Sequence, residues 1–133
     1  MIAMSKTTIA TIILLGISAV LAVFLIIENI PPPAHKYDAF AQCIAQSSTT
    51  FYGAFWCPHC AAQKKLFGTG AQYLPYHECS TPDGSGEVQS CIDAGVKNYP
   101  TWVFANGSRL TGVAPLSQLA SKTECALPTS TPS

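Results

Sequence analysis

Two cysteines separated by two residues, in Cys57-Pro58-His59-Cys60, constrain the fold of this chain more than any other feature. They follow residues 49–55, a β-branched and aromatic run that predicts a buried strand. Pro58 suits the first turn of a helix, because its missing N–H would be unpaired there in any case. We therefore expect the motif to begin a helix directly after a strand.

The position of Cys57 at the start of a helix predicts a reactive thiol. The N-terminus of a helix offers free backbone N–H groups and a partial positive charge, which favour a thiolate over a thiol. The thiolate is the nucleophile in disulfide exchange, so a C-x-x-C at a helix start is typical of a thiol–disulfide exchanger. His59 can add positive charge near the Cys57 sulfur, and a stabilised thiolate makes the disulfide form a stronger oxidant.

A long apolar segment precedes this motif. Residues 7–27 contain no charged side chain, and about 20 such residues cross a bilayer as one helix. We predict a cytoplasmic N-terminus at 1–6, with Lys6 setting the orientation, and a membrane anchor at 7–27. The alternative is a cleaved signal peptide, although signal cores are usually about 7–15 residues and no small-x-small site follows this run. Both interpretations place the rest of the chain outside the cytoplasm, in the periplasm or at the cell exterior.

The remaining sequence predicts one small domain. Residues 28–36 contain three consecutive prolines and predict a stiff linker, residues 37–127 form the domain, and residues 128–133 predict a disordered tail. The formal net charge is zero and no basic run is present, so nucleic acid is not expected as a partner. We expect a monomer.

The predicted elements of the domain alternate between helices and strands. In chain order they are a helix at 37–47, a strand at 49–55, a helix at 58–67, a strand at 72–79, a short helix at 87–94, strands at 101–105 and 109–113, and a helix at 115–123. Asn106-Gly107 predicts a hairpin turn between the last two strands. The order predicts an α/β fold, with a central mixed sheet of about four strands and helices on both faces.

This order, with the C-x-x-C after the first strand and an aromatic-Pro-Thr segment before the third, resembles the thioredoxin fold. More narrowly, the domain resembles the thioredoxin-like domain that is fused to, or encoded beside, bacterial vitamin K epoxide reductase homologues. The resemblance covers about residues 37–119. It is carried by FYGAFWCPHC at 51–60, QKKLFG at 63–68, ECS at 78–80, YPTW at 99–102 and NG at 106–107.

The resemblance implies roles for the motif and for a substrate groove. Cys57 would attack and Cys60 would resolve, with Pro58 and His59 between them tuning the redox poise. Pro100 would be a cis-proline facing the active-site disulfide, with Tyr99 lining the groove. Trp56, next to the motif, is expected to be partly exposed and to contact substrate.

The predicted function is that of a membrane-anchored, extracytoplasmic thiol–disulfide oxidoreductase. A Pro-His pair resembles the middle residues of oxidising family members, which implies oxidation of exported protein thiols and no cofactor beyond the Cys57–Cys60 disulfide. The resemblance also implies reoxidation by a quinone-linked vitamin K epoxide reductase homologue in the same membrane. The alternatives are a reductase or isomerase fed electrons across the membrane, and a non-catalytic, disulfide-stapled binding module.

The chain departs from the family at one position. Thioredoxins and protein disulfide isomerases carry a buried acid six residues before the first active-site cysteine, where this sequence has Phe51. The proton handling that this acid provides must therefore come from elsewhere, and water and His59 are the candidates.

The other four of the six cysteines predict structural disulfides, because the domain lies outside the cytoplasm. Four cysteines allow three pairings. The resemblance implies a structural Cys79–Cys91 disulfide, although a shuttling role for that pair is the alternative. Cys43 and Cys125 are then left over, and they either form a crosslink that closes most of the domain or remain free thiols.

Two other interpretations of the C-x-x-C are weaker. It is also half of a zinc site, but the expected second C-x-x-C or H-x₃₋₅-H is missing, so no metal is predicted. A purely structural disulfide within the motif would close a very small loop, which removes little entropy from the unfolded chain.

Overall fold

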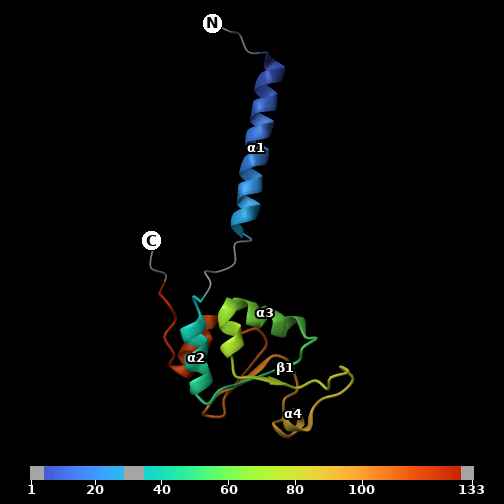
Figure 1. The fold of residues 1–133 in the computed structure, drawn as a ribbon, viewed down its shortest axis with the longest axis vertical. Coiled ribbons are helices and arrows are strands. Elements are labelled where there is room, and N and C mark those ends of the chain that lie inside the picture. The colour runs from blue at the N-terminus through green and yellow to red at the C-terminus, as the bar shows by residue number, and fades with distance from the viewer. Residues whose placement is uncertain (1–4, 29–34, 130–133) are drawn as a thin grey trace. The chain divides into compact units, whose positions relative to one another are not determined.

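The computed structural model describes residues 5–28 and 35–129. The chain divides into two compact units, residues 1–32 and residues 33–133. The first unit contains helix α1, Lys6–Glu28 (Figure 1). Its segment Lys6–Ile26 has a mean hydropathy of 2.9 and is long and apolar enough for a membrane anchor or a signal sequence. The three prolines of the predicted linker and the end of the predicted tail lie outside the described residues.

The second unit is built on a four-stranded mixed sheet with the strand order β2-β1-β3-β4. Strand β1 pairs in parallel with β2 and antiparallel with β3, which pairs antiparallel with β4. Figure 1 shows α3 and α4 on opposite sides of β1, so helices cover both faces. This is the thioredoxin-like fold predicted from the sequence. The elements are α2 Asp38–Gln46, β1 Thr50–Gly53, α3 Pro58–Leu66, the 3₁₀ helix η1 Gly68–Tyr73, β2 Tyr76–Glu78, α4 Gln89–Asp93, β3 Thr101–Val103, β4 Arg109–Thr111 and α5 Leu116–Thr123.

The strand predicted at 72–79 is wrong in its first half. Gly68 ends α3 with a φ of 55°, and the chain continues as η1 before β2 begins at Tyr76. Gly70 packs so closely on the start of α2 that a Cβ there would lie 2.8 Å from the Tyr37 carbonyl oxygen. The close packing of η1 on the start of α2 is a tertiary contact that no local sequence pattern reveals.

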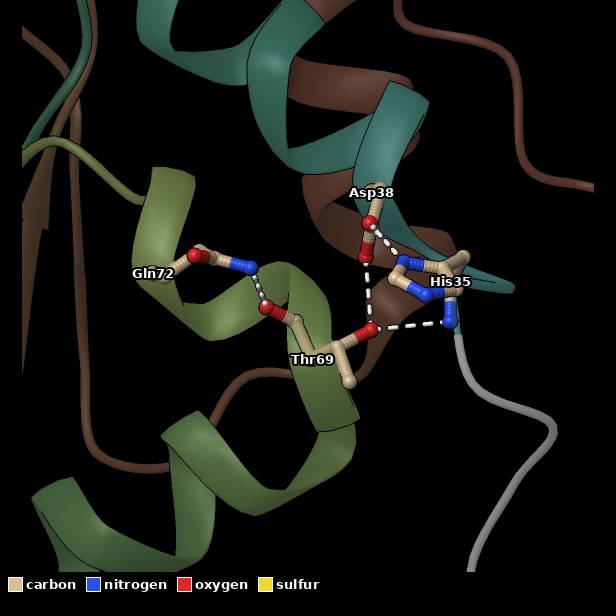
Figure 2. Close-up of polar contacts among 4 residues, drawn as sticks. All are labelled: His35, Asp38, Thr69 and Gln72. Carbon is tan, nitrogen blue, oxygen red and sulfur yellow. Dashed lines mark hydrogen bonds and ion pairs between the residues drawn. The ribbon is translucent and has the colours of Figure 1, made fainter.

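Polar side chains also join η1 to the start of α2 (Figure 2). The Thr69 hydroxyl donates to Asp38 Oδ1 at 2.8 Å and accepts from the His35 backbone N–H at 2.8 Å. His35 Nδ1 lies 2.7 Å from Asp38 Oδ2, and the hydrogen bond from His35 is the main reason that the pKa of the Asp38 carboxyl is lowered. Gln72 Nε2 donates to the Thr69 carbonyl at 3.1 Å.

Aromatic rings fill the core beneath the sheet. Phe51 of β1 and Trp102 of β3 are register partners, both are fully buried, and their rings stack with centroids 4.4 Å apart. Phe67 and Leu119 belong to the same buried cluster. Burial of each such side chain stabilises the fold by about 1.5–3 kcal/mol. Phe51, which stands where thioredoxins have an acid, is therefore a core residue here.

Two disulfides crosslink segments of the domain. Cys79 at the end of β2 is joined to Cys91 in α4, across a sequence separation of 12. Cys43 in α2 is joined to Cys125 after α5, across a separation of 82.

Candidate active site

The motif lies at the junction between β1 and α3. Cys57 is the N-cap residue of α3, with extended backbone angles of φ −80° and ψ 118°, and Pro58 occupies the first turn. The Cys57 N–H donates to the Ala54 carbonyl at 3.0 Å, and its own carbonyl accepts from the Ala61 N–H at 3.2 Å. The structure thus places the Cys57 sulfur at the positive end of a helix, where free N–H groups favour a thiolate.

The two cysteines are free thiols with unequal surroundings. Cys57 is 6% exposed and Cys60, further along the first turn, is 1% exposed. Burial raises the pKa of the Cys60 thiol to about 12, although the Ala54 N–H and the Lys64 ammonium act in the opposite direction. Pro58 and His59 are exposed between them. Cys57 is therefore the more accessible sulfur and Cys60 the one held within the fold.

The segment before β3 faces the thiols. The Tyr99–Pro100 peptide bond is cis, and Pro100 is buried. The Cys57 thiol donates to the Tyr99 carbonyl oxygen, with 3.7 Å between sulfur and oxygen. The structure therefore brings Cys57 and Cys60 together with Tyr99 and Pro100, and Cys57 and Tyr99 are 42 residues apart in sequence.

A groove and exposed aromatic rings lie beside Cys57. Phe55 and Trp56 are 59% and 54% exposed, and the Trp56 indole N–H donates to Ser80 Oγ at 2.9 Å. The Trp56 ring meets the Tyr99 ring edge-on, with centroids 6.1 Å apart. These two rings line a groove of about 250 Å³, which also includes Ser80, Gly84, Ser85, Gly86, Glu87 and Lys97. The Tyr99 hydroxyl donates to the Glu87 carboxylate.

The sequence did not predict a functional role for two residues of β2, Tyr76 and Glu78. The Tyr76 hydroxyl donates to Glu78 Oε2 at 2.8 Å, and Glu78 Oε1 accepts from the backbone N–H groups of Phe55 at 3.2 Å and Ser80 at 2.9 Å. The Lys64 ammonium lies 3.3 Å from the centroid of the Tyr76 ring. Burial, followed by the hydrogen bond to Glu78, raises the pKa of Tyr76, so its hydroxyl keeps its proton at neutral pH.

A third overlooked residue fixes the position of α3. Gln63 is fully buried and is the hydrogen-bond partner of groups from two other segments. Its Nε2 donates to the Ala114 carbonyl at 3.1 Å, while its Oε1 accepts from the Ala114 N–H at 2.7 Å and the Trp102 indole N–H at 3.4 Å. A buried amide with all these partners orients the helix that carries both active-site cysteines.

Within residues 5–28 and 35–129, no group of three or more His, Cys, Asp or Glu side chains is arranged to hold a metal ion.

A mixed sheet, a C-x-x-C at a helix N-terminus and a cis-proline beside its first sulfur together fit a thioredoxin-like fold. No family model matches the chain. The chain is similar to the thiol-disulfide oxidoreductase LTO1 of Arabidopsis thaliana, with 39% identity over 90 residues. The alignment covers 64% of this chain and 23% of that relative, so the chain spans about a quarter of its length.

Proposed function

We propose that this chain is a membrane-anchored thiol–disulfide oxidoreductase that oxidises the thiols of exported proteins. The observation that carries the proposal is the position of Cys57, which caps α3 and contacts the carbonyl next to Pro100, with Cys60 behind it. The similarity to LTO1 supports the same chemistry. The N-terminus of α3, where Cys57 lies, favours a thiolate, which favours the oxidising direction.

The cycle begins with the Cys57–Cys60 disulfide. A substrate thiolate attacks the Cys57 sulfur, the S–S bond breaks, and Cys60 leaves as a thiolate that takes up a proton. A second substrate thiolate then attacks the mixed disulfide, which releases a substrate disulfide and leaves both cysteines reduced. Two electrons have passed to the enzyme, and a quinone-linked vitamin K epoxide reductase homologue in the same membrane would remove them.

The substrate would approach through the groove beside Trp56 and Tyr99. The Tyr99 carbonyl, which accepts the Cys57 thiol in the reduced protein, lies on the backbone beside Pro100 that would pair with an extended substrate segment. Exposed Phe55 and Trp56 offer apolar contact area at the edge of this groove. Broad apolar contact of this kind suits a site that acts on thiols in many different client sequences.

The direction of electron flow is tested by the reduction potential of the Cys57–Cys60 couple. We expect a value in the oxidising half of the span from about −270 mV for thioredoxin to about −120 mV for the strongest periplasmic oxidant. Equilibration in glutathione buffers, with the thiols counted by alkylation, gives this value. A His59→Gln variant should shift the potential to more negative values, because it removes a side chain that can carry positive charge. A wild-type potential near −270 mV would support the reductase alternative instead.

The proposed role of α1 is to anchor the catalytic domain near its partner, because tethering raises the effective concentration of the two proteins. We expect the full chain to stay in the membrane pellet after an alkaline carbonate wash. A variant that lacks residues 1–34 serves as the soluble control. Release of the full chain by the wash, or an N-terminus that begins after α1 in the mature protein, would show that the segment is a signal sequence.

A further inference from the structure

The proposed cycle requires Cys60 to lose a proton each time the enzyme is reoxidised. Burial raises the pKa of the Cys60 thiol, so most of it stays protonated at neutral pH and its proton must be removed before it can attack. The position that holds an acid in thioredoxins is occupied by Phe51, which is buried among apolar rings. A proton acceptor for Cys60 must therefore come from another element.

Strand β2 brings a tyrosine and a glutamate to Cys60. Tyr76 and Glu78 are two residues apart on the strand, so their side chains point to the same face. Strand β1 lies next to β2 and ends at Gly53, directly before the loop that leads to Cys57. A Cβ on Gly53 would lie 2.9 Å from the Cys60 sulfur, 2.7 Å from the Tyr76 ring and 3.4 Å from the Tyr76 hydroxyl. The Cys60 sulfur and the Tyr76 hydroxyl therefore both border the space that a side chain at Gly53 would fill.

The hydrogen bonds fix the direction in which a proton can move. The Tyr76 hydroxyl donates its proton to Glu78 Oε2, so its oxygen has only lone pairs to offer to the Cys60 thiol. Two backbone N–H groups hold the Glu78 carboxylate in place, and the residue is only partly buried. A proton that reaches Glu78 can therefore pass on to water.

Other ionisable groups that face Cys60 are less suited to accept its proton. Cys57, on the same helix, is itself in the mixed disulfide when Cys60 must react, and Lys64 is a cation. The Tyr99 hydroxyl, before β3, is bonded to Glu87 beside the substrate groove. His59 is exposed and lies about 100° around the helix from Cys60. Glu78 is the carboxylate that is hydrogen-bonded to the hydroxyl bordering the same space as the Cys60 sulfur.

We propose that Tyr76 and Glu78 form a proton relay for Cys60, an inference that rests on the proposed function. When a disulfide has reacted with Cys57, the Cys60 S–H bond breaks as the Tyr76 oxygen takes the proton, and Tyr76 passes its own proton to Glu78. The Cys60 thiolate attacks the Cys57 sulfur, the bond from Cys57 to the partner breaks, and the partner leaves as a thiolate. The two cysteines are oxidised, the partner disulfide is reduced, and Glu78 releases its proton to water.

The test separates the two chemical steps with oxidised glutathione as the probe. Reduced full-length protein in detergent is mixed with excess probe, quenched with acid at short intervals, and analysed by mass spectrometry. In the wild type, we expect the Cys57–glutathione mixed disulfide to resolve as fast as it forms. In Glu78→Gln and in Tyr76→Phe, it should form at the wild-type rate but resolve at least about tenfold more slowly. Resolution in these variants should then rise steadily with pH, because hydroxide replaces the relay.

The controls are the same chemical changes at exposed sites, Tyr73→Phe and Glu124→Gln, which should leave both steps unchanged. If Glu78→Gln fails to fold, Tyr76→Phe decides, since it removes one oxygen and keeps the ring beneath Lys64. Wild-type resolution rates in the folded relay variants would overturn the relay. A mixed disulfide that never forms, even when Cys60→Ser blocks its resolution, would instead overturn the proposed function.

Discussion

Replacement of Cys57 with serine is expected to abolish thiol–disulfide exchange, with a loss of at least about 10³-fold in rate. A serine hydroxyl does not attack a disulfide at neutral pH. Cys60 cannot take over the role, because it is 1% exposed and its pKa is raised to about 12 by burial. The rate is measured as the oxidation of a dithiol peptide and as the reduction of insulin by dithiothreitol.

Replacement of Cys60 with serine gives the informative contrast. This variant keeps the attacking sulfur but loses the one that resolves the mixed disulfide, so it should trap a covalent complex with client or partner. The complex should appear on a non-reducing gel and disappear with reductant, and Cys57→Ser should not form it. Equal exchange rates for the wild type and Cys57→Ser would contradict the proposed enzymatic function and would favour the non-catalytic binding module.

The parts of the fold that could be predicted depend on short stretches of sequence. Pro58 marks the first turn of α3, and the turn signal Asn106-Gly107 connects β3 to β4, with Gly107 at a φ of 79°. The turn closes with the Gly107 N–H on the Phe104 carbonyl at 2.8 Å. In each case the signal lies within the element that it predicts and needs no partner from a distant segment.

The parts that could not be predicted depend on the register between strands that are distant in sequence. The pairing of Gly53 with Glu78 places β2 against the motif, and only this register brings Tyr76 to Cys60. In the sequence, Gln63 cannot be distinguished from an exposed polar helix residue. Its role depends on hydrogen bonds to Trp102 and Ala114, which only the tertiary structure brings close. The sequence did contain one signal for Tyr76 and Glu78: a Tyr-x-Glu pattern in a predicted strand, in a chain that has Phe51 where thioredoxins have an acid.

Loss of the Cys43–Cys125 disulfide is expected to have the largest effect on stability. Its sequence separation of 82 means that the crosslink restricts most of the unfolded domain. The loop-entropy relation gives about 4.5 kcal/mol for such a loop and about 3 kcal/mol for the shorter Cys79–Cys91 loop. Since small domains are stable by only about 5–15 kcal/mol, the first loss removes a large share of the free energy of unfolding.

The measurement is guanidinium unfolding of two double variants, Cys43→Ala/Cys125→Ala and Cys79→Ala/Cys91→Ala, followed by tryptophan fluorescence. Both variants remove two half-cystines from partly or fully buried positions, so each controls for the packing loss in the other. The first should be less stable than the second by about 1–2 kcal/mol. The opposite order would contradict the loop-entropy explanation for these two bridges.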